Sequence, residues 1–262
     1  MPYSEPLDVI PLWGIILITV AVILLSIECG FRLGQFRRRG SEMEDKPPVG
    51  EMVAATLALL MFMLAFTFGM AAARFEVRRG LVIDEANAIG TTYLRAGLLP
   101  EPYREEVRKL LREYMSVRLE AIRPEKLNQS ISRSEELQSQ LWSRAAAVGE
   151  KNPGSIVVGL FIGSLNEVID LHAKRLALGV RNRIPSPIWA ALYFMAVLGT
   201  AAMGYHAGLA GSGRSLAIVA LVLAFSAVMT LIADLDRPQA GLLRVSQQTM
   251  IDLQRTLLSS SR

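Results

Sequence analysis

The stretch MVAATLALLMFMLAFTFGMAAA, residues 52–73, decides the fold class, because no charged side chain interrupts it. An α-helix needs about 20 such residues to cross the hydrocarbon core of a bilayer, which is roughly 30 Å thick. Lipid offers the backbone no hydrogen-bond partners, so a segment of this kind must be helical. Three further runs share this length and lack of charge, namely residues 9–27, 188–208 and 216–233. The sequence therefore predicts an all-α polytopic protein whose four transmembrane helices are embedded in a lipid bilayer.

Charged residues make up 20% of the 262-residue chain, and most of them lie between residues 74 and 185. Apolar positions at helical spacing predict helices over 102–122, 135–148 and 155–181, with a loop at 127–134 and Ser132 or Ser134 as the following N-cap. We expect one long helix to run from residue 52 to about 99. The predicted parts are a first transmembrane helix with a basic loop (1–51), a second with an extramembrane extension (52–99), a helical extramembrane domain (100–185), a transmembrane hairpin (186–233) and a C-terminal tail with a short helix (234–262).

The composition argues against several classes of function. The net charge of +4 comes without a nucleic-acid recognition motif, and basic residues beside membrane spans commonly face anionic lipid. Cys29 is the single cysteine, and His172 and His206 are the two histidines, so we expect no disulfide and no metal site. No phosphate-binding loop, dinucleotide fingerprint or catalytic triad order is present. We therefore expect no nucleic-acid partner, no cofactor and no catalytic residues, and the protein is not expected to be an enzyme.

The distribution of short-loop charges predicts the orientation in the membrane. The first ten residues contain Glu5 and Asp8 but no Lys or Arg, whereas Arg37, Arg38 and Arg39 follow the first run. The positive-inside rule then places the N-terminus outside and the basic loop in the cytoplasm. The helical domain would also lie outside. Arginines that flank the domain side of the membrane favour the opposite orientation, so both remain open.

A polar stripe follows the second apolar run. On a helix, Asn87, Thr91 and Arg95 share one face by steps of four residues, with Asp84 beside them. Such a stripe can line the vestibule of an ion pathway. A hydrogen-bonded seam between helices or a solvated face would give the same pattern.

The membrane part of the same helix presents an apolar stripe. Phe62, Phe66 and Met70 recur every four residues. Apolar side chains that face a common axis can block ions by excluding water from a constriction. Ordinary packing or lipid contact is the alternative interpretation. Thr67 is a polar side chain of this run, and its hydroxyl can bond to its own helix.

Charged residues also gather where three segments meet one membrane face. An even number of crossings separates these chain positions, so they share a side in either orientation. We predict ion pairs among them that fix the helix ends, or an electropositive mouth that attracts anions. The residues are Arg74, Arg78, Arg79, Arg181, Arg183, Asp234, Asp236 and Arg237.

Several motifs together resemble a bacterial family of membrane proteins known as bestrophin-like. The motifs are residues 66–71, 78–79, 84–91 (DEANAIGT), 93–95 with Leu99-Pro100, Leu165-Asn166 with 170–172, 181–185, and 234–238 (DLDRP) with Gly241 and Val245-Ser246. The resemblance implies a protein of the bacterial inner membrane. It also implies a homo-oligomer, a pentamer if it assembles as bestrophins do, in which the second helix and its apolar neck line an anion pore. Bestrophins keep the corresponding domain in the cytoplasm, which conflicts with the orientation predicted above, and their calcium-binding acidic clusters are not found in this sequence.

We therefore expect a homo-oligomeric channel that conducts small anions. Phe62, Phe66 and Met70 would form its constriction, and Asn87, Thr91 and Arg95 would coat its wetter vestibule. The alternative is a non-conducting membrane scaffold or sensor whose helical domain binds a partner. A closed ring with an axial cavity would favour the channel, and a monomer or dimer without one would favour the scaffold.

Overall fold

The computed structural model describes residues 10–40, 49–211, 216–238 and 241–259, which form eight α-helices and no strand. Glu5 and Asp8, used above to predict the orientation, lie outside these residues. The chain divides into two compact units. Of the described residues, those within 10–73 and 183–237 form the membrane unit, and those within 74–182 and 238–259 form the polar unit. The predicted all-α class is confirmed over the described residues.

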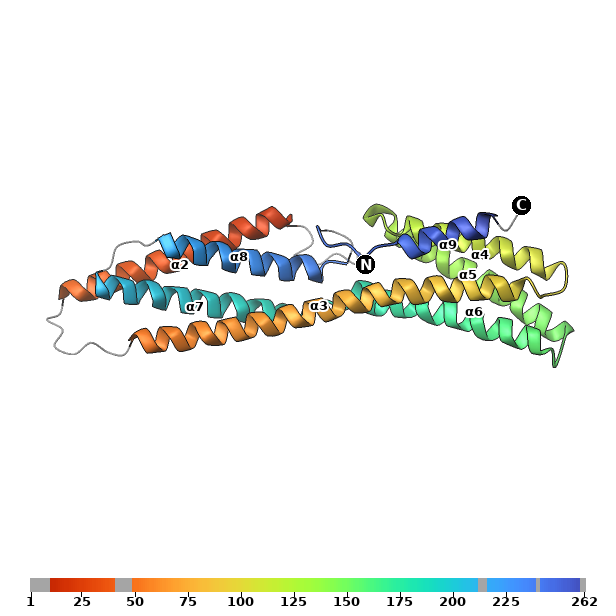
Figure 1. Ribbon diagram of the computed structural model, residues 1–262, viewed down its shortest axis with the longest axis horizontal. Helices are drawn as coiled ribbons and strands as arrows, with labels where there is room; N and C mark the ends of the chain where they lie inside the picture. The colour runs from red at the N-terminus through yellow and green to blue at the C-terminus, as the bar shows by residue number, and fades with distance from the viewer. Residues whose placement is uncertain (1–9, 41–48, 212–215, 239–240, 260–262) are drawn as a thin grey trace. The chain divides into compact units, whose positions relative to one another are not determined.

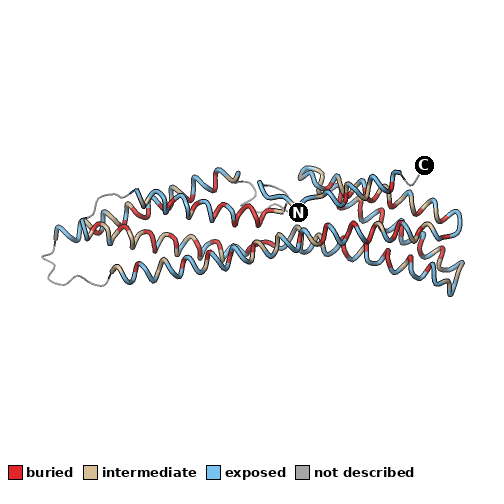
Figure 2. Tube along the Cα trace, viewed as in Figure 1, coloured by how far each residue is buried: buried red, intermediate tan, exposed pale blue. Residues whose placement is uncertain are grey.

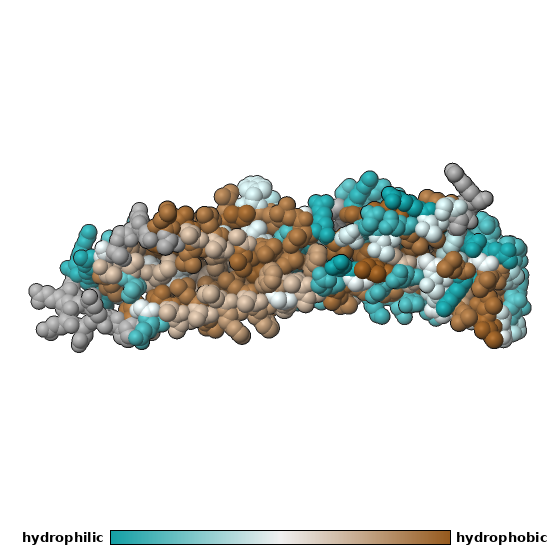
Figure 3. Space-filling view, in the orientation of Figure 1, coloured by the Kyte–Doolittle hydropathy of each residue, from teal (hydrophilic) through white to brown (hydrophobic). Residues whose placement is uncertain are grey.

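The membrane unit contains α2 (Leu12–Gly40), the first half of α3 (Val49–Ala96), α7 (Ser186–Ala210) and α8 (Leu216–Asp236). The face of this unit that Figure 3 shows is largely hydrophobic, as expected for helices in lipid. The predicted spans 52–73, 188–208 and 216–233 lie in α3, α7 and α8, and residues 12–27 of the first predicted span lie in α2. By length and composition, a fifth helix, Ile156–Gly179, is also apolar enough to cross a membrane. The five candidates establish a helical integral membrane protein.

Glycines bring α2 and α7 into close contact. A methyl group added to Gly204 would overlap the carbonyl oxygen of Ile27, and one added to Gly208 would overlap that of Phe31. Gly30 and Gly34 of α2 approach the backbone of α7 in the same way. Small residues spaced four apart let helix backbones approach closely, which drives packing in lipid where the hydrophobic effect does not. The two helices run parallel, because the residue numbers of the contacting positions increase in the same direction along both helices (Figure 1).

We expect Gly204→Ala to weaken the α2–α7 contact, because the added methyl group meets backbone atoms that cannot rotate away. Overpacking of this kind costs about 1–3 kcal/mol. Unfolding of the purified protein in mixed micelles, followed by helix content, measures the loss. Gly69→Ala is the matched control, since a methyl group at Gly69 would have nothing within 4 Å. Equal stability of the two variants would contradict the prediction.

The polar unit is a helical bundle built from the second half of α3 with α4 (Tyr103–Glu120), α5 (Leu127–Lys151), α6 (Ile156–Lys174) and α9 (Gln248–Ser259). A short 3-10 turn, η1 (Pro124–Lys126), precedes α5, and the π-helix η2 (Arg175–Arg181) continues α6. Fully buried apolar side chains from successive helices form one core, including Ile89, Leu111, Leu141 and Phe161. Met250 and Leu257 join this core, so the C-terminal helix is part of the bundle. Figure 2 shows the buried faces of these helices turned toward one another.

Two sequence predictions about the polar unit have different outcomes. The long helix through the second apolar run is confirmed, because α3 is continuous from Val49 to Ala96. The predicted loop at 127–134 is wrong, because α5 begins at Leu127. Its serines do not interrupt the helix: Ser134 is buried and donates a hydrogen bond to the carbonyl of Ser130, 2.7 Å away. Tertiary packing has overridden the weak helix propensity of these residues.

Candidate functional site

The membrane half of α3 carries the predicted constriction on an uncovered face. Phe62 and Phe66 are 68% and 66% exposed, and Met70 is half-buried. The buried share of the most apolar window of α3 is 22%, against 33–39% in the other candidate spans. Thr67 instead is buried and donates to the carbonyl of Met63 at 2.8 Å, as predicted. A single copy of the chain therefore leaves the two phenylalanines available to lipid or to another copy.

The polar half of α3 divides the predicted vestibule residues into two groups. Asn87 and Thr91 are exposed, as is the neighbouring Asp84. Arg95 is half-buried, and its Nη1 donates to the carbonyl oxygen of Leu160 on α6 at 2.8 Å. Arg95 therefore connects α3 to α6. The exposed face of α3 is thus apolar in the membrane unit and polar in the polar unit.

The opposite face of α3 contributes a buried carboxylate to the centre of the polar unit. Glu85 is fully buried, and Arg118 Nε of α4 donates to its Oε1 at 2.8 Å. Arg118 Nη2 lies 3.3 Å from Oε2, and Arg175 at the start of η2 also donates to that oxygen. Tyr114 donates its hydroxyl to Oε1 at 3.3 Å, and Gln138 of α5 donates to the tyrosine oxygen at 3.2 Å. One carboxylate therefore joins α3, α4, α5 and η2.

The charges around Glu85 determine its protonation state. Burial by itself would raise its pKa, but the positive charges of Arg118 and Arg175 and their hydrogen bonds outweigh burial and lower the pKa to about 2. Burial and the Glu85 carboxylate together raise the pKa of Tyr114. Glu85 is therefore an anion and Tyr114 a neutral hydrogen-bond donor across the physiological pH range.

Sequence reasoning included Glu85 in the motif 84–91 but missed its partners. A signal was present, because Arg118 follows Leu111 and Tyr114 at steps of three and four, on the apolar face of α4. A basic residue on the buried face of a helix indicates a buried acid elsewhere in the fold. His172 also lies near this cluster, with its ring centroid 6.5 Å from that of Tyr114. It is buried, and neither ring nitrogen has a hydrogen-bond partner among the described residues.

The predicted membrane-face cluster contributes a buried ion pair to the membrane unit. Arg183 Nε lies 3.2 Å from Oδ2 of Asp236, and Oδ1 of the same aspartate accepts the backbone N–H of Ile184 at 3.0 Å. This pairing of the end of α8 with the residues before α7 is the kind that the sequence predicted. Arg237 additionally donates to the carbonyl of Ile10, just before α2. A clamp function for these contacts stays a prediction.

The other members of that cluster belong to different surroundings. Arg79 is exposed and pairs with Glu76 of its own helix at 3.6 Å, whereas Arg78 and Asp234 are buried. The side chain of Arg181 lies outside the described part of the structure. Within residues 10–40, 49–211, 216–238 and 241–259, no group of three or more His, Cys, Asp or Glu side chains is placed to hold a metal ion.

Comparison with known proteins identifies the family. The family model described as the bestrophin-like domain matches residues 18–250, from the second turn of α2 into α9. No curated protein and no solved structure matches the chain. The family match includes both faces of α3, the Glu85 cluster and the Arg183–Asp236 pair, and it confirms the resemblance seen in the sequence motifs. Because the match extends over most of the chain, the protein belongs to the bestrophin-like family.

Proposed function

We propose that the protein is a homo-oligomeric channel for small anions, with α3 of each copy lining the path. The observation that carries this proposal is the uncovered face of α3, where Phe62 and Phe66 are exposed in the membrane unit and Asn87 and Thr91 in the polar unit. A ring of such helices would give a dry constriction followed by a wetter vestibule. The charge of Arg95 beside the vestibule would favour anions over cations.

The proposal requires more than one copy of the chain. The four apolar runs contain no charged residue, so one copy supplies no charged pathway through the bilayer. A second copy is the occupant we assign to the uncovered face, because an axial path forms only when several α3 helices face each other. Membership of the bestrophin-like family supports this reading by analogy, and a pentamer is the ring that the analogy favours.

We further propose four membrane crossings, with α6 in the polar unit. The parallel contact of α2 with α7 supports this count, because one crossing by α3 returns the chain to the starting side. A second intervening crossing by α6 would make α2 and α7 antiparallel. The side chains of α6 also pack in the core of the polar unit, where Phe161, Leu165 and Val168 are fully buried.

Mass measurement of the purified protein in native lipid particles and flux in liposomes together test the channel. We expect a closed oligomer and chloride efflux above that of empty vesicles, with little potassium efflux. A monomer or dimer with no flux would overturn the channel and leave the membrane scaffold as the function that the fold supports. Oligomers without flux would retain the assembly and reject conduction.

For orientation, we propose that the polar unit lies outside the cytoplasm, because Arg37 to Arg39 occupy the last turn of α2 on the other side. In a Cys29→Ser background, Glu135→Cys, at an exposed position of α5, should react with an impermeant maleimide in intact spheroplasts. Glu51→Cys, exposed at the start of α3, is the matched control and should react after lysis only. The reverse pattern would place the polar unit in the cytoplasm, as in bestrophins.

A further inference from the structure

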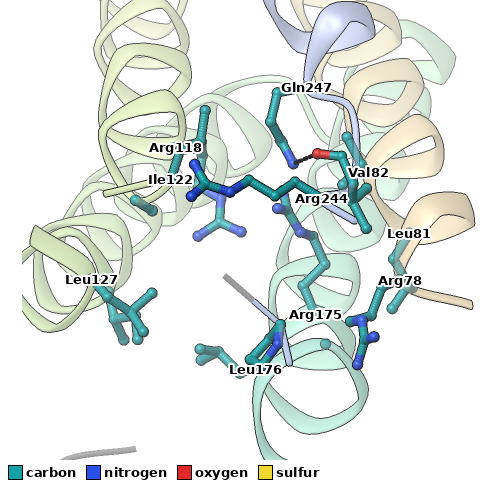
Figure 4. A pocket seen from close by; sticks show the side chains of 15 residues that line it. Arg78, Leu81, Val82, Arg118, Ile122, Leu127, Arg175, Leu176, Arg244 and Gln247 are labelled. Carbon is teal, nitrogen blue, oxygen red and sulfur yellow. Dashed lines mark hydrogen bonds between the residues drawn. The ribbon is translucent and has the colours of Figure 1, made fainter. Parts of the chain in front are cut away.

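The polar unit contains a cavity of about 120 Å³ that the proposed ion path does not use. Side chains from α3, α4, α5 and η2 line it, and the segment that leads into α9 closes one side. Four arginines from four different elements reach it: Arg78, Arg118, Arg175 and Arg244. Figure 4 shows these side chains gathered around the open space, with Leu127 and Leu176 on the opposite wall.

The cavity carries an excess of positive charge. None of the described residues that line it is acidic. The nearest compensation is Glu85, whose single carboxylate accepts from both Arg118 and Arg175. Arg244 donates its Nε to the carbonyl of Gly241 at 3.1 Å and has no ion-pair partner among the described residues. Two guanidinium groups therefore share one carboxylate, Arg244 adds a third positive charge, and Arg78 also lines the cavity.

Burial fixes two of the four arginines in place. Arg78 and Arg118 are each 5% exposed, and the two hydrogen bonds from Arg118 to Glu85 hold its guanidinium plane. Preorganised guanidinium groups suit phosphate because they donate paired hydrogen bonds to its oxygens in a fixed geometry. Water is a poor competitor where apolar residues such as Leu81, Val82 and Ile131 form the rest of the wall.

We infer that this cavity binds a phosphate group, with Arg244 completing the site from the C-terminal segment. The volume accommodates about four waters or one phosphate with its first substituent. Two of the lining residues are close in sequence to apolar membrane segments. Arg78 follows the apolar run 52–73 by about one helical turn, and Pro238 comes two residues after α8. A lipid headgroup and a free phosphate compound share the required chemistry, and the site does not depend on whether the protein conducts ions.

Calorimetric titration of the full-length protein in detergent tests this site. The probes are inorganic phosphate and the soluble short-chain lipid dihexanoyl phosphatidylglycerol, each in chloride buffer of physiological ionic strength. We expect saturable binding to the wild type. Arg244→Gln should weaken binding about tenfold or more, because a charge-assisted hydrogen bond is lost. Arg244 is exposed, so this variant should fold normally.

Two further variants separate a built site from general surface charge. Gly179→Leu should abolish binding while leaving every arginine in place, because Gly179 lines the cavity and has open space where a side chain would begin. Arg255→Gln is the matched control, since its side chain on α9 is 74% exposed and does not line the cavity. Binding of both probes identifies a free phosphate group as sufficient, and binding of the lipid probe alone identifies a headgroup. If neither probe binds, or if Arg244→Gln and Gly179→Leu bind as the wild type does, the assignment is wrong.

Discussion

Replacing Glu85 by alanine is expected to lower the free energy of unfolding of the polar unit by about 3–5 kcal/mol, because it leaves buried arginine charge without its counter-ion. The carboxylate accepts from Arg118 and Tyr114 of α4 and from Arg175 of η2, so its removal breaks contacts to both elements. Arg118 is 5% exposed and cannot turn to water without opening the bundle.

Denaturant unfolding in mild detergent, followed by the fluorescence of Trp142 on α5, measures this loss. Glu113→Ala provides the matched control, because Glu113 also pairs with an arginine, Arg133, but both side chains are about 40% exposed. Solvent-exposed pairs of this kind contribute about 0–1 kcal/mol. If Glu85→Ala costs no more than Glu113→Ala, the Glu85 cluster does not hold the bundle together.

Much of the membrane architecture could be predicted because its physical rules are local. Length and absence of charge predicted helices over all four apolar runs, and the absence of a break after Ala73 predicted the continuous helix α3. The glycines at 30, 34, 204 and 208 were equally visible in the sequence. Their role depends on which helices become neighbours, and α2 and α7 are separated along the chain by α3, α4, α5 and α6. The start of α5 was missed because its first residues have weak helix propensity, which predicted a loop. Packing in the folded bundle makes them helical.

The candidate sites were predictable only where one helix supplies them. Spacing along α3 placed Phe62 and Phe66 on one face and Asn87 and Thr91 on one face, and both pairs are exposed. Spacing could not show that Arg95 is engaged by Leu160, because that contact joins α3 to α6. The arginine cavity was also out of reach. Its lining comes from positions as distant as Arg78 and Arg244, which only the folded bundle brings together.

Phe66→Ala is expected to raise anion flux through the proposed channel by about tenfold or more. Phe66 is 66% exposed on the membrane face of α3, where a ring of such side chains would keep the constriction dry. Truncation to alanine widens the constriction and lets water remain in it, so an ion keeps more of its hydration shell. A barrier lowered by about 1.4 kcal/mol gives a tenfold increase in rate. Chloride efflux from liposomes, at equal protein content and with the oligomer mass checked, measures the change.

Phe194→Ala is the control that separates a pore-lining side chain from a lipid-facing one. Phe194 lies on α7 and is 62% exposed, so it matches Phe66 in residue type and exposure. Because α7 is not assigned to the axis, its truncation should leave flux unchanged. Equal increases in both variants would indicate general leak from a loosened protein. An increase with Phe194→Ala alone would assign the path to α7, and flux unaffected by Phe66→Ala in an intact oligomer would remove α3 from the pore.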